Sequence, residues 1–521
     1  MARTPLMHFL KRAVRRAGVE WRAAEGILPP GRDGIEISRR DVLAGGAATA
    51  AATMLPLPAG AAQARIAIVG AGLAGLSAAH ELRKTYGLHV HVYEGNTRVG
   101  GRCFSSRGHF AQRQVAEHGG ELIDTDHHAI RRLARELGLT LDDVLAAVPG
   151  GTEALYMFNG RPYNLADATR DWRPIYHRVQ KQANKIGDYS YKSSSKAAKR
   201  FDAMTIPEWV QRYVPGGTRG ALGQLIQNAF TEENALDPDQ QSALNVIQTL
   251  AEDPRNNFNL YYTESDQRFH IRGGNDQIAI ILANRLGARL HTGTRLIAIQ
   301  QRNDERVVRL TFRQSGNVFD RVYDRVILTV PFSVMMRRAV NFSKAGFRPL
   351  KVRAINTLPM GVSCKTQLQF TRRAWYDVGC NSEIRLPAVA FDTTWDVTRA
   401  QPGAFGILNF FAGGTQALQA GEIANRALAQ LLMQEAEPLI PGLAQLWNGL
   451  MIKNAWQFNP WSFGSYSTYQ PGYQTTVLGI EREPERNCFF AGEHTASQNG
   501  FLNSAVETGE RAARQVAASL V

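Results

Sequence analysis

The stretch Ile66-Ala67-Ile68-Val69-Gly70-Ala71-Gly72-Leu73-Ala74-Gly75 decides the fold of this chain. Its four leading apolar residues predict a short buried strand, and the glycines with Ala74 open a segment with helical spacing of leucine and alanine. In such a strand–turn–helix unit, Gly70 permits a tight turn, Gly72 lets the backbone approach a pyrophosphate, and Gly75 allows close packing of helix on strand. The start of the helix then provides an anion site.

A second predicted strand, residues 90–93, ends at Glu94. A carboxylate at this position can accept hydrogen bonds from the hydroxyl groups of a ribose. Strand, glycine turn, helix, strand and acid together predict a dinucleotide-binding βαβ unit. They do not by themselves distinguish FAD from NAD.

Composition limits the class of protein. A chain of 521 residues is too long for one compact core, so two domains are expected. The apolar fraction of 44% and the charged fraction of 20% are typical of a soluble globular enzyme. No basic run interleaved with aromatic residues accompanies the net charge of +14, so nucleic-acid binding is not expected. Neither a disulfide framework nor a metal site is expected from the widely separated cysteines, which are Cys103, Cys364, Cys380 and Cys488.

Residues 1–64 are interpreted as a targeting segment that is not part of the fold. Ser38-Arg39-Arg40-Asp41-Val42-Leu43 is a twin-arginine pattern, followed by a weakly apolar Ala/Gly-rich stretch and a small-residue region that ends at Ala64. Because the apolar stretch is too short to span a bilayer comfortably, a cleaved signal and export to the periplasm are favoured over stable membrane insertion. The alternative is an Ala-rich leader on a cytoplasmic protein.

The segment Gly100-Gly101-Arg102 follows soon after Glu94, and here the chain resembles the flavin-containing amine oxidase superfamily, which includes monoamine, polyamine and L-amino-acid oxidases. Further similar blocks lie at 117–121, 272–276, 294–296, 326–331, 489–494 and 505–509. The resemblance implies an α/β fold in which a Rossmann-like FAD-binding domain of the GR2 type is interleaved with an α+β substrate domain. The expected FAD-binding domain comprises 65–124, 265–349 and 485–521, and the expected substrate-binding domain with its helical insert comprises 125–264 and 350–484.

The resemblance also implies residues that contact FAD. Gly101 and Arg102 would pass along the diphosphate, where a guanidinium can pair with phosphate oxygens. The strand at Leu296 would contact the adenine through its backbone. Gly492 and Glu493 form a turn near a helix N-terminus whose positive end can face the flavin, and Glu493 would bond groups on the ribityl or diphosphate side.

The catalytic residues are likewise implied by the resemblance. Lys365 is followed by Trp375 at the spacing seen in monoamine and L-amino-acid oxidases, where the lysine holds a water near flavin N5 and assists reoxidation by oxygen. Trp375 itself is expected to bind substrate. Tyr466 and Phe501 match the two walls of an aromatic cage that guides the amine and excludes water. Ser465 stands where monoamine oxidases have the cysteine that attaches the flavin, so FAD is expected to be non-covalent.

The substrate class depends on Arg107, which has the spacing at which L-amino-acid oxidases clamp a carboxylate. Phe410 is the expected position of the tyrosine that assists this clamp in those enzymes. The hypothesis is oxidative deamination of an L-amino acid to the 2-oxo acid, ammonia and hydrogen peroxide, with molecular oxygen as acceptor. The alternatives are a monoamine or polyamine oxidase that forms an aldehyde, a desaturase or porphyrinogen-type oxidase, and a flavin-binding scaffold without turnover. Homo-oligomer formation stays open.

Overall fold

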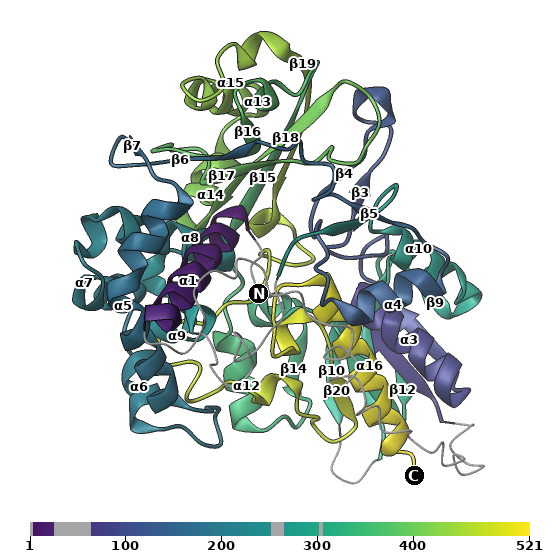
Figure 1. The fold of residues 1–521 in the computed structure, drawn as a ribbon. Coiled ribbons are helices and arrows are strands. Elements are labelled where there is room, and N and C mark those ends of the chain that lie inside the picture. The colour runs from purple at the N-terminus through teal and green to yellow at the C-terminus, as the bar shows by residue number, and fades with distance from the viewer. Residues whose placement is uncertain (1–3, 25–63, 252–264, 302–305) are drawn as a thin grey trace.

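A computed structural model describes residues 4–24, 64–251, 265–301 and 306–521 (Figure 1). The fold is α/β, and two domains built from interleaved segments lie against one another. One domain is centred on a parallel sheet and the other on an antiparallel sheet with a group of helices at its side. This arrangement confirms the expected fold class.

The first domain is built on a five-stranded parallel sheet. Its strands, in spatial order, are β20 (Cys488–Phe490), β13 (Arg325–Leu328), β1 (Ile66–Val69), β2 (Val90–Tyr93) and β9 (Leu290–His291). All residues of β1 are buried, as expected for a central strand covered on both faces. Val69 pairs with Leu328 and with Tyr93, so the carboxyl ends of three strands meet beside the glycine turn.

Helices cover one face of this sheet. They are α3 (Leu73–Tyr86), α4 (His128–Glu136), α10 (Gln277–Asn284) and α16 (Leu502–Ala518). Ile130 and Leu133 of α4 belong to the same core as α3 and α16. The boundary expected at 125 therefore has to move beyond α4, because an amphipathic pattern shows that a helix packs but not which element it packs on.

The other face is covered by a second sheet and two short helices. The sheet strands, in spatial order, are β12 (Asn317–Tyr323), β11 (Val308–Gln314), β10 (Arg295–Gln301) and β14 (Asn341–Lys344). The helices are α11 (Phe332–Val334) and α12 (Pro349–Thr357). Ala67 and Val69 of β1 share a core with Leu296 of β10.

The substrate domain contains an antiparallel sheet of the strands β17 (Thr393–Asp396), β18 (Gly406–Gly413), β15 (Ser363–Phe370) and β19 (Trp447–Ala455). A smaller sheet has the strands β16 (Cys380–Arg385), β6 (Glu153–Phe158) and β7 (Arg161–Pro162). Nearby helices are α13 (Ala374–Asp377), α14 (Gly414–Glu422) and α15 (Asn425–Ala436). Two further short ribbons are β3 (Ser105–Ser106) with β4 (Ala116–Glu117) and β5 (Leu141–Asp143) with β8 (Phe269–Ile271).

A helical layer forms the side of the substrate domain. It contains α5 (Leu165–Ile186), α6 (Lys196–Asp202), α7 (Ile206–Tyr213), α8 (Ala221–Asn234) and α9 (Ala243–Leu250). A further helix, α1 (Pro5–Ala24), lies across α5 and α8 in the same core (Figure 1). This corrects the expectation that all of residues 1–64 stand outside the fold, since residues 5–24 are a packed part of it. The twin-arginine pattern lies outside the described residues. No helix in the described part of the chain is long and apolar enough to cross a membrane.

Candidate active site

One cavity of about 420 Å³ runs between the two domains. Its lining begins at Glu94 beside the parallel sheet and continues past the glycine turn to Lys365 on β15. The expected site residues that line it are Gly70, Gly72, Ala74, Glu94, Gly101, Arg102, Leu296, Lys365, Tyr466, Gly492, Glu493 and Phe501. Segments far apart in the sequence therefore meet at one site.

The glycine turn has the geometry of a dinucleotide cradle. Gly70 has a φ of +108°, and a Cβ there would lie 2.2 Å from the Thr329 hydroxyl oxygen. A Cβ on Gly75 would lie 1.9 Å from the carbonyl oxygen of Gly70, so no larger side chain fits between helix and turn. Helix α3 begins after Gly72, so its first amide groups and its positive dipole end face the cavity. These residues fit the diphosphate of FAD.

Glu94 occupies the position suited to a ribose. One of its carboxylate oxygens accepts a hydrogen bond from the Ala71 amide at 2.8 Å, and the other accepts from the Asn96 amide at 2.8 Å. Burial raises the pKa of Glu94, while these backbone hydrogen bonds act in the opposite direction. Because a carboxylate can accept several hydrogen bonds, Glu94 can hold the turn and still accept from ribose hydroxyls.

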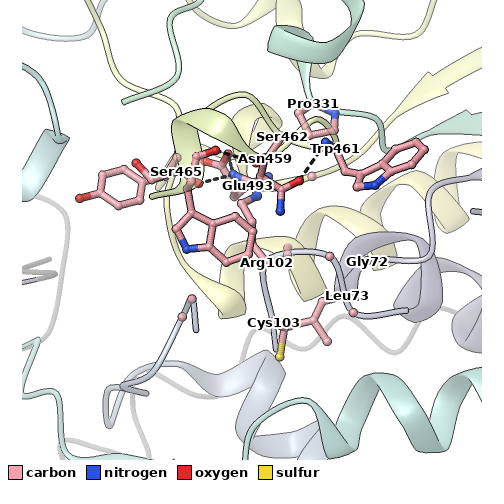
Figure 2. Close-up of a pocket in the computed structure, with 18 of the residues that line it drawn as sticks. Gly72, Leu73, Arg102, Cys103, Pro331, Asn459, Trp461, Ser462, Ser465 and Glu493 are labelled. Carbon is pink, nitrogen blue, oxygen red and sulfur yellow. Dashed lines mark hydrogen bonds and ion pairs between the residues drawn. The ribbon is translucent and has the colours of Figure 1, made fainter. Parts of the chain in front are cut away.

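Arg102 and Glu493 form an ion pair at the centre of the cavity wall (Figure 2). The Arg102 guanidinium donates to a Glu493 carboxylate oxygen at 2.7 Å and to the carbonyl oxygen of Ser465 at 2.8 Å. Burial opposes ionisation of Glu493, but the charges of Arg102 and His494 and the hydrogen bonds from Arg102 and Ser467 lower its pKa. Glu493 is thus held as an anion that locks Arg102 in place. The Ser465 hydroxyl donates to Gly361, and this position has no thiol that could attach a flavin.

Lys365 is held by an acidic partner. Its ammonium donates to Oε2 of Glu121 at 2.5 Å and to the carbonyl oxygen of Gly119 at 3.3 Å. The indole N–H of Trp395 donates to the other oxygen of Glu121 at 3.1 Å. The lysine therefore has a defined position on the cavity floor, between the carboxylate and the Trp395 ring.

Aromatic side chains enclose the region around Lys365. The Tyr466 hydroxyl donates to the carbonyl oxygen of Glu232 at 2.8 Å, and the Phe501 ring meets the His127 ring edge-on at 5.1 Å between centroids. Phe411 lies against Trp395, with centroids 5.7 Å apart. All but His127 and Glu232 line the cavity, which gives its substrate side π faces.

Three residues expected to bind substrate do not line the cavity. Arg107 donates to Asp276 at 2.5 Å and to the carbonyl oxygen of Gly273 at 2.7 Å, so its guanidinium is engaged beside the ribbon β3–β4. Phe410 is 1% exposed and packs on Phe391, because its side chain points to the opposite face of β18 from that of Phe411. Trp375 is fully buried against Phe370 in the core of the substrate domain. These placements correct the sequence-based assignments.

Three residues of the substrate side were not predicted from the sequence; they are Glu121, Trp395 and Phe411. Glu121 was within a recognised motif, but nothing in its spacing pointed to Lys365, which lies far away in sequence. Trp395 and Phe411 come from adjacent strands, and Phe411 pairs with both Lys365 and Thr393. That register could have been found only by aligning β15 with β18.

A dinucleotide cradle that opens onto a buried lysine between aromatic walls defines a flavin-dependent oxidoreductase. The chain belongs to the family described as flavin containing amine oxidoreductase, whose sequence model matches residues 73–517. Members of this family bind FAD, and the residues of the cradle described above fit its diphosphate. A twin-arginine translocation signal matches residues 36–56, which confirms export to the periplasm.

Similar proteins include enzymes with different substrates. Flavin-containing amine oxidase A of Sus scrofa is 25% identical over 473 residues, covering 87% of this chain and 84% of that protein. An L-amino-acid oxidase of Mus musculus is 26% identical over 470 residues, covering 87% of this chain and 70% of that protein. The solved structure of cyclohexylamine oxidase from Brevibacterium oxydans has a TM-score of 0.75 at 18% identity and covers 88% of this chain and 99% of that chain. These similarities establish an amine oxidoreductase and leave its substrate class open.

Proposed function

We propose that this protein oxidises a primary amine that carries no carboxylate on the reacting carbon. The observation that supports this proposal is the distribution of positive charge in the cavity. The arginines among its described lining residues are Arg98, Arg102 and Arg295, and all three come from segments of the flavin-binding domain. On the substrate side Lys365 is already paired with Glu121, so no described cation is available to clamp a substrate carboxylate.

The walls of the cavity suit an uncharged amine with an apolar substituent. Tyr466, Phe501, Trp395 and Phe411 offer ring faces to the substrate and exclude water. An amine taken from water into such surroundings has a lowered pKa, which favours the neutral form required for oxidation. Bound FAD would supply the acceptor for the hydride of the carbon that bears the amine and would return the two electrons to oxygen as hydrogen peroxide. The products of the primary amine would then be an aldehyde and ammonia, with water supplying the aldehyde oxygen.

Lys365 and Glu121 act as one unit in this proposal. The carboxylate and the Gly119 carbonyl fix the direction of the ammonium, which leaves its remaining N–H able to hold a water in the cavity. Trp395 keeps Glu121 in place from the other side. We infer that Lys365 supports the reaction with oxygen and that Glu121 is its positioning residue.

The test is a panel of amines and L-amino acids assayed for peroxide with the FAD-loaded enzyme, followed by identification of the carbonyl product. Aldehyde formation from primary amines, with little turnover of L-amino acids, is the expected result. A 2-oxo acid formed at comparable or higher kcat/KM would establish the rival, an L-amino-acid oxidase. Anaerobic bleaching of the yellow flavin spectrum by the best substrate distinguishes either enzyme from a flavin-binding scaffold without turnover.

A further inference from the structure

Helix α1 precedes the export signal in the sequence, yet it is packed inside the folded enzyme. Its apolar side chains recur at helical spacing and are at most 2% exposed; they are Leu6, Met7, Leu10, Ala13, Val14 and Ala17. They share one core with Trp172 and Val179 of α5 and Leu225 and Ile226 of α8. An apolar helix face is typical of a helix that packs on a core and not of an exposed leader. The groove along α5 and α8 is therefore a docking surface whose occupant is Pro5–Ala24.

Specific contacts fix α1 in this groove. The Phe9 ring meets the Tyr156 ring edge-on at 4.8 Å, and the Trp21 ring stacks on His177 at 5.4 Å. Near the end of the helix, the Arg22 guanidinium donates to the Tyr176 hydroxyl at 3.0 Å. Glu20 forms an ion pair with Arg173 of α5. The docked position is therefore defined along the whole length of the helix.

The start of α1 reaches the substrate cavity. Thr4 is one of the residues that line the cavity, together with Asp124 and Gln267. Burial lowers the pKa of Lys11, and the charges of Glu233 and Asp124 act in the opposite direction. Docked α1 thus places Thr4 in the wall of the cavity.

Export places the residues before the apolar part of the signal and the residues after it on opposite sides of the membrane. Residues 1–42 hold nine Lys/Arg against five Asp/Glu, so the segment before the apolar part of the signal has a net positive charge. Positive charge next to an apolar stretch holds that segment on the cytoplasmic side. The two enzyme domains, called the body of the enzyme, follow the signal in the sequence and cross to the periplasm. Helix α1 lies before the signal, and α5 and α8 lie after it. Helix α1 therefore cannot stay packed on α5 and α8 once these segments are on opposite sides of the membrane.

We propose that docking of α1 and completion of export are mutually exclusive. Helix α1 fills its groove in the cytoplasmic precursor and leaves the groove when the body crosses the membrane. The exported enzyme consequently has an open groove along α5 and α8 and a cavity wall without Thr4. Its cavity is wider at this wall than that of the precursor.

The first experiment uses the wild-type full chain with a C-terminal tag in a bacterium with a functional twin-arginine pathway. Native and denaturing mass spectrometry of the periplasmic enzyme are expected to give the same mass, that of a chain that lacks residues 1–24. Hydrogen exchange on the cytoplasmic precursor, retained by Arg39→Lys with Arg40→Lys, is expected to show protected amides in α1. Folded periplasmic enzyme that still holds α1, as a continuous chain or as a bound peptide, would overturn the proposal.

The second experiment changes the strength of docking. Leu10→Asn places an amide in the buried face of α1, and Ala24→Asn makes the matched, charge-neutral change at an exposed position of the same helix. Pulse–chase fractionation is expected to show several-fold faster export of the Leu10→Asn chain, while Ala24→Asn follows the wild type. Equal export rates for all three chains, with α1 protected in each precursor, would contradict a docked helix that must be released. Neither experiment depends on which amine the enzyme oxidises.

Discussion

Lys365 and Glu121 form a buried ion pair on the floor of the cavity, with 2.5 Å between Nζ and Oε2 and only 5% of each side chain exposed. The two residues lie on different segments, one on β15 and the other in the turn after β4. Removing charges from water is costly, so such a pair is maintained only where both partners are present and well oriented. The pair therefore couples the stability of the domain interface to the geometry of the site.

Glu121→Gln should lower the free energy of unfolding by about 3 kcal/mol, because it leaves a buried ammonium without its carboxylate. The double variant Glu121→Gln with Lys365→Met should recover a substantial part of that loss. Denaturant unfolding of the single and double variants measures the coupling. Glu136→Gln, which breaks the exposed pair with Lys84, is the control and should cost about 1 kcal/mol or less. Equal costs for Glu121→Gln and the control would contradict a buried, coupled pair.

Lys365→Met should slow reoxidation of the reduced enzyme by oxygen by roughly 10²-fold, the typical contribution of one positioned proton donor or acceptor. Stopped-flow spectroscopy separates this step from anaerobic reduction by the amine, which should change much less. Lys344→Met, at an exposed position of β14, should behave as the wild type. Unchanged reoxidation in Lys365→Met would remove this lysine from the reaction with oxygen.

Arg107→Ala should leave kcat/KM unchanged for both amines and L-amino acids, because the guanidinium is bound by Asp276 and Gly273 outside the cavity lining. Its loss should cost about 1 kcal/mol or less of stability, since the pair is partly exposed. Steady-state kinetics with both substrate classes provide the check. A selective loss of several kcal/mol in transition-state binding for amino acids would instead assign Arg107 to a carboxylate clamp.

Stability should depend on pH through Glu117. Burial raises the pKa of Glu117 to about 8 from its ordinary value of 4.5, although Asn275 and Ser105 donate hydrogen bonds to it. A carboxyl with a raised pKa in the folded state stabilises the fold at low pH and loses that contribution as the pH rises toward 8. The pKa of Glu117 is about 8 in the folded state and about 4.5 in the unfolded chain. The melting temperature of the wild type should therefore fall relative to that of Glu117→Gln as the pH rises from about 5 to about 8. Parallel pH profiles for the two proteins would argue against a neutral Glu117.

Gly75→Ala should abolish FAD binding, because the added Cβ would lie 1.9 Å from the Gly70 carbonyl oxygen and force the glycine turn away from α3. The purified variant is expected to be colourless and to take up no added FAD in an absorbance titration. Gly150→Ala is the matched control, since a Cβ at that position meets nothing within 4 Å. A yellow, FAD-replete Gly75→Ala protein would show that the cradle tolerates displacement.

The sequence by itself determined the cofactor half of this protein. Ile66–Val69 and the glycines that follow it encode their structure locally, because strand, turn and helix N-terminus are adjacent in the chain. Glu94, Arg102 and Glu493 were recognised through motifs of the same kind, and each lines the cavity. The twin-arginine signal was equally readable, since it is a linear pattern.

Only the tertiary structure decided the substrate half. Whether Phe410 or Phe411 faces the cavity depends on the pleat and pairing of β18, where neighbouring residues point to opposite faces. The partners of Lys365 and Arg107 come from distant segments, which spacing along the chain cannot bring together. The packing of helix α1 could not be predicted from the sequence for the same physical reason. Its apolar face is visible in the sequence, but the groove that buries this face exists only after α5 and α8 have folded.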